Sequence, residues 1–465
     1  MLRGYPEQPS PVAGGSLALH VSTDAPEFRV EILRCGAVLT PCGGSGWLPG
    51  VDAPPHRADA DWGKPGVAVD GEPLIPWPAY RLEVPAEWPP GAYVALLVEG
   101  DGSGRDASDP DRTTPDGRDA RALFVVRPPA PTARILYKLP LLTYHAYDMV
   151  DGERWSPDTN RGTWCIYSDD LPPGTAEPPA VGLHRPGGGT GGVPFDLRNF
   201  DPFDPTPRQT FAHWDWRFLG WLERNGYAVD VCTDMDLHVH GPALLDGHRL
   251  LVSAGHDEYW SDEMRTAVEG FVAGGGNLAF FSGNTMWWRI AFDGPTAFRR
   301  ANRWSDPDTP GEPENTLLGA SFRNGGERDR DERRDPVGFR VQHADSWVFA
   351  GTGLRDGDVL GEKEYLVGYE CDGAHFDRAD LEAGRPVRPS GIDGTPTDVT
   401  ILGVGDLARG GWGFGNAAAT MLVRDGSDGR GTVFSAATTD WARVLADGRE
   451  PAVDRITRNL LDRLG

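Results

Sequence analysis

Short runs of alternating apolar and polar residues dominate the first 127 residues of the chain. They are separated by turns and by Gly-rich or polar connections, and no helical pattern of any length intervenes. Alternation with a period of two is typical of strands that bury one face. We therefore predict an antiparallel β-sandwich. Its strands are expected at residues 16–21, 28–33, 80–84, 92–98 and 122–126.

The pattern changes after a Pro-Pro-Ala-Pro run at residues 128–131, which predicts a stiff linker. We place the domain boundary there, with one domain at residues 1–130 and a second at 131–465. Beyond the linker, continuous apolar runs alternate with patterns of helical period. Because this β-α-β-α-β order is typical of parallel strands joined by helices, it predicts a mostly parallel sheet with covering helices.

The elements expected in the second domain follow from these runs. Strands are predicted at 133–139, 227–232, 250–252, 277–282, 399–404, 418–423 and 432–437. Helices are predicted at 208–225, from the Ser261 N-cap to the glycines at 274–276, and at 451–464. The aromatic-rich residues 141–148 are expected to form a loop, and residues 283–398 to be largely irregular.

One strand ends in a concentration of ionisable and aromatic side chains, in the stretch RLLVSAGHDEYW at residues 249–260. In open α/β sheets the carboxyl ends of the strands are where ligands bind. If the strand geometry continues, His256 and Glu258 lie on one face and Asp257 on the other. From spacing alone, the pair can be a metal ligand with a base, a structural ion pair or a turn cap. We take this stretch as the candidate active site.

Composition narrows the classes of partner. The net charge of −24 argues against a surface that binds nucleic acid or an anionic membrane. The 5 cysteines show no zinc-ligand spacing and no disulfide framework. The N-terminus lacks an apolar leader and no stretch approaches the length of a membrane span. We therefore expect a soluble, cytoplasmic protein.

Other candidate groups are weaker. A serine nucleophile at Ser253 or Ser282 would need an elbow such as GxSxG, which is absent. His238 and His240 lack a third metal ligand at useful spacing, which favours a polar loop. Further acidic residues follow later strands without an assigned role. They are Glu370, Asp372 and Asp440.

Several segments together resemble the C-terminal region of the large subunit of N,N-dimethylformamidase and its relatives. The resemblance covers roughly residues 134–464 and is strongest in the block from Gly255 to Arg289. It is carried by LPLLTYHAYD, WLERNGYAVDVCTDMDL, SAGHDEYWSDEMRTAVEGFVAGGGNLAFFSGNTMWWR, VGYECD and TVFSAATTDWAR. With the strand pattern, it predicts an α/β domain of the flavodoxin-like or glutamine-amidotransferase-like kind, preceded by the antiparallel β-sandwich.

The resemblance also implies a site: one iron ion per chain, expected as Fe³⁺, held by two tyrosinate oxygens and one glutamate beside a catalytic histidine. Carried onto this chain, the metal ligands are Tyr147, Tyr167 and Glu258, and the histidine is His256. Phenolate and carboxylate are hard donors that suit such an ion. Further residues are expected to line the pocket. They are Tyr144, Asn284 and Trp288.

We therefore expect an iron-dependent hydrolase of a small amide or formamide, in which the metal polarises the carbonyl and His256 moves the proton. The alternative is a non-catalytic binding or scaffold protein that keeps the fold and recognises a carbohydrate or a partner. The substrate stays open, as does the choice between a homo-oligomer and a separate small subunit. No nucleic-acid or membrane partner is expected.

Overall fold

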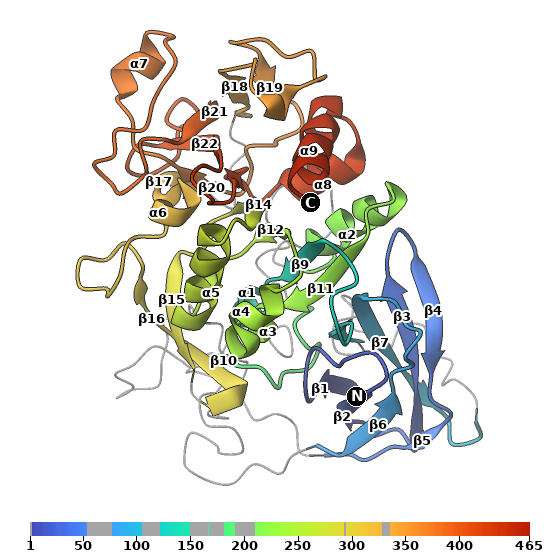
Figure 1. Cartoon of the computed structure of the whole chain (residues 1–465). Helices are drawn as coiled ribbons and strands as arrows, with labels where there is room; N and C mark the ends of the chain where they lie inside the picture. Colours follow the sequence, from blue (N-terminus) through green and yellow to red (C-terminus); the bar gives the residue numbers. More distant parts are fainter. Residues whose placement is uncertain are drawn as a thin grey trace.

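The computed structural model describes residues 2–53, 77–104, 121–148, 166, 181–190, 210–292, 294–327 and 335–465. Its N-terminal strands form two antiparallel sheets (Figure 1). One has the order β1-β2-β6, and the other has the order β4-β3-β7-β8 with β5 also paired to β3. The bounds are β1 Arg3–Pro6, β2 Ser16–Ser22, β3 Glu27–Cys35, β4 Leu39–Gly44, β5 Leu48–Pro49, β6 Ala79–Glu83, β7 Gly91–Gly100 and β8 Arg121–Val126.

The two N-terminal sheets share one apolar core. Alternate residues of β2, such as Leu17 and Leu19, pack with Val30 of β3 and with Phe124 of β8. Because each strand turns one face to this core, the sequence alternates as expected of a sandwich. The five predicted strands appear as β2, β3, β6, β7 and β8. The boundary between the two predicted domains stays a prediction.

A nine-stranded mixed sheet follows, with the order β11-β9-β12-β14-β23-β22-β21-β18-β19. The first five strands are parallel and the others pair antiparallel. In chain order the parallel strands lie 2-1-3-4-5, an order that supports the flavodoxin-like or glutamine-amidotransferase-like fold, which stays a proposal. The bounds are β9 Ile135–Leu139, β11 Val229–Thr233, β12 Leu250–His256, β14 Asn277–Gly283, β18 Phe339–Val341, β19 Val359–Leu360, β21 Thr400–Asp406, β22 Ala418–Arg424 and β23 Val433–Ser435.

Helices cover both faces of the parallel half (Figure 1). On one face α2, α8 and α9 pack against β12 and β14, and on the other α3, α4 and α5 form a second layer. Successive β12 residues therefore enter different cores: Val252 faces the first layer and Leu251 the second. The bounds are α1 Leu141–Tyr147, α2 Asp215–Arg224, α3 Asp234–His240, α4 Pro242–Leu245, α5 Asp262–Ala273, α6 Asn315–Leu318, α7 Arg378–Glu382, α8 Trp441–Asp447 and α9 Pro451–Leu464.

Two smaller sheets and two 3₁₀ turns complete the described elements. The first sheet has the order β10-β16-β15-β13, and the second pairs β17 with β20. Their bounds are β10 Val181–Gly182, β13 Tyr259–Trp260, β15 Trp288–Phe292, β16 Ala297–Arg303, β17 Ser321–Glu327 and β20 Glu370–Gly373, with 3₁₀ turns η3 Gly294–Thr296 and η4 Trp347–Phe349.

Three local predictions were wrong. Residues 141–147 form helix α1 rather than a loop, because the Asp234 carboxylate accepts a hydrogen bond from the Leu142 N–H and so satisfies the helix start from another element. The helix expected from 208 begins at Asp215, after turns at 210–214. Residues 283–398 contain strands β15 to β20, whose short pairings leave no periodic signal in the sequence. The Ser261 cap of α5 and helix α9 are confirmed.

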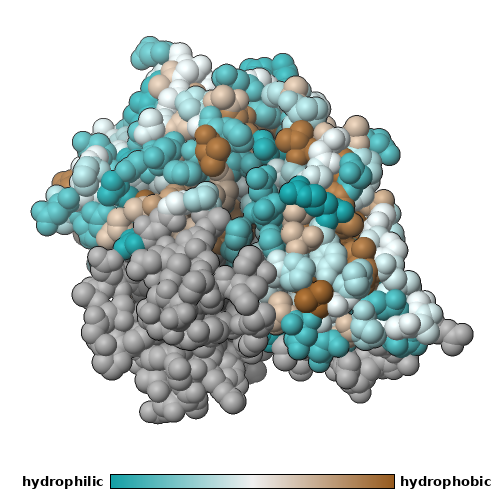
Figure 2. Space-filling model, turned by 90° about the horizontal axis from the view of Figure 1, so that it is seen from below, coloured by the Kyte–Doolittle hydropathy of each residue, from teal (hydrophilic) through white to brown (hydrophobic). Residues whose placement is uncertain are grey.

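The described surface mixes polar and apolar residues. On the face shown in Figure 2, hydrophobic residues appear as separate spots among hydrophilic ones. Exposed large hydrophobic side chains, such as Val239 and Ile392, belong to different elements. Within the described ranges, no helix combines the length and the apolar character needed to cross a bilayer.

Candidate active site

The candidate site lies at the carboxyl ends of β9 and β12, which are adjacent and parallel. This is where the order of the parallel strands reverses: β9 leads on to β11 on one side, and β12 lies on the other. Side chains at such a point face a crevice beyond the strand ends. Helix α1 follows β9 and ends at Tyr147, while β12 ends at His256. Two segments more than 100 residues apart are therefore brought to one edge.

Tyr147 and Glu258 make the central contact of the site. The Tyr147 hydroxyl donates a hydrogen bond of 2.7 Å to Glu258 Oε2, and both side chains are buried. A second hydrogen bond joins the same two segments, because the backbone N–H of Glu258 donates to Thr143 Oγ1 at 3.0 Å. Thr143 and Tyr147 are one helical turn apart on α1, so a single face of that helix holds Glu258 at two points.

His256 lies between two carboxylates. Its Nε2 is 3.3 Å from Glu258 Oε2 and 2.8 Å from Glu370 Oε2, and its ring is fully buried. Burial by itself lowers the pKa of His256, but the negative charges of Glu370, Glu258 and Asp372 oppose it and raise the pKa to about 9. The raised pKa favours the imidazolium form, whose Nε2 lies within ion-pair distance of Glu370.

The His256 ring is also fixed by aromatic neighbours. Trp214 packs edge-on against it with centroids 5.8 Å apart, and Tyr147 lies on another side at 5.6 Å. Gly255 makes this approach possible: its φ is +71°, and a Cβ there would lie 2.6 Å from Trp214 Cβ. Gly255 is therefore needed both for its backbone angle and for the space that Trp214 occupies.

Glu370, on β20, had no role assigned to it from the sequence. Besides the contact with His256, its Oε2 accepts a hydrogen bond of 2.9 Å from Asn284 Nδ2. Asn284 has a positive φ of 49°, in the left-handed region that asparagine adopts more readily than most side chains. The signal available in the sequence was only an acidic pair, Glu370 and Asp372, after an apolar run.

Asp372 lies on the same strand, two residues after Glu370, and is buried. Its Oδ2 accepts a hydrogen bond of 3.2 Å from the Thr285 N–H. Burial, together with the charges of Glu314 and Glu370, raises the pKa of Asp372 to about 8. Among the described residues, the carboxyl groups that act on His256 thus include those of Glu258, Glu370 and Asp372.

Asp257 points to the other side of the turn, as predicted. Its Oδ1 is 2.7 Å from Lys138 Nζ, and both side chains are buried. Ser253 Oγ donates to its other oxygen at 2.6 Å, and the Trp260 indole N–H donates to Oδ1 at 3.0 Å. The Lys138 ammonium also lies 4.7 Å from the centre of the Trp260 ring. Asp257 is therefore an anchor beneath the turn that presents His256 and Glu258.

Tyr144 faces away from Glu258. Its hydroxyl donates a hydrogen bond to Asp215 Oδ2, and Tyr137 donates to the other oxygen of Asp215 at 2.6 Å. Burial raises the pKa of Asp215 to about 7, although both tyrosine hydroxyls act in the opposite direction. Of the two tyrosines on α1, Tyr147 is thus the one whose hydroxyl contacts Glu258.

Three candidate residues remain, and Tyr167, the first of them, lies outside the described residues. Trp288, on β15, packs with the guanidinium groups of Arg300 and Arg303 at 4.7 and 5.3 Å, and its backbone N–H donates to the Glu258 carbonyl. Its place in the pocket stays a prediction. His238 lies on helix α3 rather than in the expected polar loop, and its Nδ1 is 2.8 Å from Ser261 Oγ.

Some of the donor atoms at this site suit the iron ion that the family resemblance implies. Among the described residues, no group of three or more His, Cys, Asp and Glu side chains is arranged to hold a metal ion. Two oxygens at right angles around a first-row ion, each about 2 Å from it, lie about 3 Å apart. The separation of 2.7 Å between Tyr147 Oη and Glu258 Oε2 fits two ligands of one ion. A phenolate and a carboxylate are also the hard donors that ferric iron favours.

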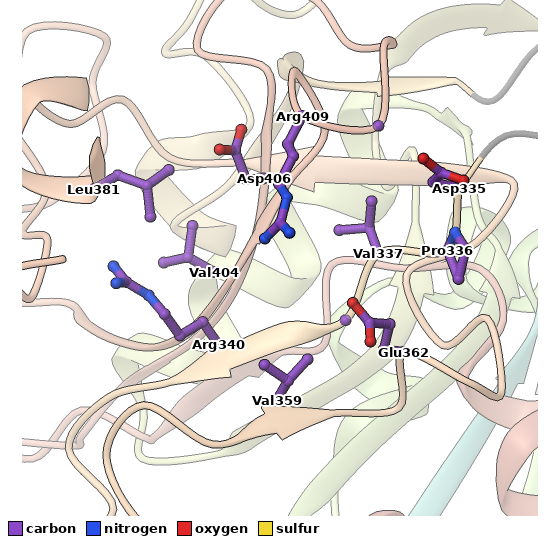
Figure 3. A pocket seen from close by; sticks show the side chains of 12 residues that line it. Asp335, Pro336, Val337, Arg340, Val359, Glu362, Leu381, Val404, Asp406 and Arg409 are labelled. Carbon is purple, nitrogen blue, oxygen red and sulfur yellow. The ribbon is translucent and has the colours of Figure 1, made fainter. Parts of the chain in front are cut away.

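A separate cavity of about 420 Å³ lies at the antiparallel edge of the large sheet, on β18 and β21. Figure 3 shows Arg340, Arg409 and Glu362 around a floor that includes Val337 and Val404. It shares no residue with the cluster around His256. The residues that line this cavity include no histidine held between buried carboxylates, so we assign the cavity no chemical role.

A family model and individual relatives both relate this chain to N,N-dimethylformamidase beta subunits. Residues 69–454 match the family model described as "N,N-dimethylformamidase beta subunit-like, C-terminal". The N,N-dimethylformamidase beta subunit of Paracoccus aminophilus is 26% identical over 295 residues, which covers 55% of this chain and 38% of that protein. The beta subunit from Alcaligenes sp is 28% identical over 214 residues, covering 39% of this chain and 27% of that protein. Each alignment thus spans well under half of the relative.

Proposed function

The chain belongs to the N,N-dimethylformamidase beta subunit-like, C-terminal family, and on that premise we propose that it hydrolyses the C–N bond of a small amide or formamide at a single ferric ion. The observation that carries this proposal is one buried cluster at the carboxyl edge of the parallel strands, in which Tyr147 contacts Glu258 and His256 lies between Glu258 and Glu370. Hard oxygen donors and a proton carrier thus meet at one point.

The metal ligands in this proposal are Tyr147, Glu258 and Tyr167. When bound, the ion supplies a Lewis acid for the amide carbonyl. Helix α1 contributes Tyr147 and also, through Thr143, fixes the backbone of Glu258. Burial of the Tyr147 and Glu258 side chains excludes bulk water, which strengthens their interaction with a cation.

The proton chemistry belongs to His256 and Glu370. Their 2.8 Å contact lets a proton pass between the imidazole and the carboxylate. Water adds to the carbonyl carbon and gives a proton to Glu370, and His256 gives its own proton to the leaving amine as the C–N bond breaks. Glu370 then returns its proton to His256. Acid–base help of this kind is worth about a hundred- to ten-thousandfold in rate.

Asn284 orients the base. Its amide N–H donates to Glu370 Oε2, the same oxygen that contacts His256 Nε2. A carboxylate held by two donors keeps a fixed direction, and positioning of this precision is a large part of enzymatic rate enhancement.

The first experiment is metal analysis of the purified chain. We expect about one iron per chain and a visible tyrosinate-to-iron absorption band. Glu258→Ala should lose both, whereas Glu263→Ala, an exposed carboxylate on α5, should keep both. A chain that takes up no iron, with no visible band after reconstitution with ferric salts, would rule out this function and favour the binding or scaffold alternative.

The second experiment separates binding from turnover. His256→Ala should keep the iron and its absorption band but lose hydrolysis of N,N-dimethylformamide and of short formamides. Release of the amine and of formate is the direct readout. Full activity in this variant would remove His256 from the mechanism.

The subunit composition is a further part of the proposal. Both relatives are named as beta subunits, and we extend to this chain an assembly with a second, smaller chain or with its own copies. Light scattering of the isolated chain tests the second case, since a monomeric mass with full activity would exclude a need for assembly.

A further inference from the structure

A ten-residue segment, residues 181–190, lies between the N-terminal sheets and helix α1. On the sheet side, the Gly187 N–H donates to the Gly4 carbonyl of β1 at 2.9 Å, and the Leu123 N–H of β8 donates to the Gly187 carbonyl at 3.0 Å. We refer to residues 181–190 as the strap. Two strands from the N-terminal sheets thus hydrogen-bond to a single strap residue.

His184 adds a ring contact to these backbone bonds. Its ring stacks on Tyr5 of β1 with centroids 5.4 Å apart, and its Nε2 lies 3.1 Å from the Glu7 carbonyl. Tyr5 in turn stacks on His20 of β2 at 5.0 Å. The strap is therefore attached to the three-stranded sheet at several points.

Two consecutive glycines allow the strap to touch both of its neighbours. A Cβ at Gly188 would lie 2.6 Å from Pro6 Cδ, in β1, and a Cβ at Gly189 would lie 3.0 Å from Leu141 Cδ2 and 3.1 Å from His145 Nε2, in α1. Both residues have positive φ, of 59° and 87°. Side chains there would push the N-terminal sheets and α1 apart.

Arg185 is the strap residue that reaches the end of α1. It is fully buried, and its Nη1 donates to the Asp148 carbonyl at 2.7 Å and to the His145 carbonyl at 3.3 Å. The last carbonyls of a helix have no partner within the helix, and a cation there is favoured by the helix dipole. Tyr147 lies between the two residues that Arg185 holds.

From these contacts we infer that Arg185 is a positioning residue: held by the N-terminal sheets, it fixes the end of α1 and so keeps the Tyr147 hydroxyl opposite Glu258. The N-terminal region thereby contributes to the site without supplying a group that touches substrate. This inference rests on the proposed function only where it concerns the metal, because the Tyr147–Glu258 contact is defined without one.

The test compares Arg185→Gln and Arg185→Lys with a matched control, Arg378→Gln. Arg378 also donates to two backbone carbonyls, those of Asn416 and Ala417, but lies on α7. In the metal-free protein, hydrogen exchange of a peptide covering residues 141–148 should accelerate in Arg185→Gln, less in Arg185→Lys, and stay as in the wild type in Arg378→Gln. Iron binding should weaken about 10- to 100-fold in Arg185→Gln, as for outer partners of metal ligands in general.

A second variant tests the strap from the sheet side. Tyr5→Ala removes the ring on which His184 stacks, whereas Tyr5→Phe keeps it. Tyr5→Ala should accelerate exchange in α1, and Tyr5→Phe should not. If Arg185→Gln folds and shows wild-type exchange in α1 with wild-type iron affinity, the inference is wrong. If Arg185→Gln does not fold, Tyr5→Ala decides instead, and unchanged exchange in α1 of that variant would equally show the inference to be wrong. A wild type that binds no iron would instead end the proposed function, while the exchange measurement still decides the role of Arg185.

Discussion

Three consecutive residues, His256, Asp257 and Glu258, face two environments that differ in how their charges are balanced. Asp257 points to a buried lysine, a hydroxyl and an indole N–H, so each of its oxygens has a donor. His256 and Glu258 point to the opposite side, where the histidine faces several carboxylates. One turn thus has a neutralised face and an acidic face.

The difference separates stability from chemistry. Removing one partner of a fully paired buried charge is costly in stability. Such a charge, however, has no free lone pair with which to bind a metal ion or to accept a proton. A site with excess carboxylate, by contrast, raises the pKa of His256 and suits a cation or a proton in transit. We therefore expect variants at Glu370 and His256 to change activity, and variants at Lys138 and Asp257 to change stability.

The largest effect is expected for Glu370→Gln. This change keeps the size of the side chain but removes the charge that faces His256 at 2.8 Å. Because the pair would no longer accept a proton from water, amide hydrolysis should fall by about a hundred- to ten-thousandfold. Steady-state rates on N,N-dimethylformamide measure the loss, and iron content should not change.

Glu362→Gln is the matched control, because Glu362 is an exposed carboxylate at the cavity on the far edge of the sheet. It should keep wild-type turnover. Near-normal turnover in Glu370→Gln would show that the Glu370 carboxylate is not needed for proton transfer, and would leave His256 as the sole proton carrier.

Lys138→Met tests the neutralised face. It leaves the buried Asp257 carboxylate without its cation, and breaking one partner of a buried pair costs about 3–5 kcal/mol in the free energy of unfolding. Chemical denaturation of the metal-free protein measures this loss. Lys363→Met, which alters an exposed lysine, should be close to neutral.

The double variant Lys138→Met with Asp257→Leu sharpens the same point. Replacing both charges of a buried pair by apolar groups can be nearly neutral, so much of the lost stability should return. If the double variant is as unstable as the sum of its parts, the pairing is not what Asp257 contributes, and the contrast between the two faces fails.

Asp372→Asn concerns the acidic face and its dependence on pH. The pKa of Asp372 rises from 3.8 to about 8 on folding, so between these values the folded protein holds a proton that the unfolded chain has released. The contribution of Asp372 to stability should therefore fall as pH rises from about 4 to about 8 and level off above that.

The asparagine variant lacks this titration. Relative to it, the wild type should lose at least about 1 kcal/mol over the same interval, the scale of a buried group that is poorly satisfied. Urea denaturation of both proteins, without metal, at four or five pH values gives the difference. Parallel curves for the two proteins would mean that Asp372 is ionised throughout.

Much of this arrangement was predictable from local sequence. The apolar run before His256 and the alternation of His256, Asp257 and Glu258 predict a strand that ends in two faces, and the structure confirms both. The Ser261 cap and the long amphipathic helix α9 were equally local signals. Periodicity and capping are encoded within a few residues, so a single sequence is enough to find them.

The partners of that turn were not predictable in the same way. Glu370 meets His256 from a strand 114 positions later, and Lys138 meets Asp257 from 119 positions earlier. Helix α1 was missed because its start is capped by Asp234, a residue from another element. Such contacts depend on which strand ends lie side by side, and no local pattern carries that information.

The smallest effect separates the two tyrosines of α1. Tyr144→Phe removes one of two hydroxyls that donate to Asp215 and should cost about 1 kcal/mol of stability. Because that hydroxyl faces Asp215 rather than Glu258, iron content and the visible band should stay at wild-type values. Tyr147→Phe should reduce both, since it removes the oxygen that lies 2.7 Å from Glu258. The opposite outcome would exchange the roles of the two residues and move the metal to the Asp215 side of the helix.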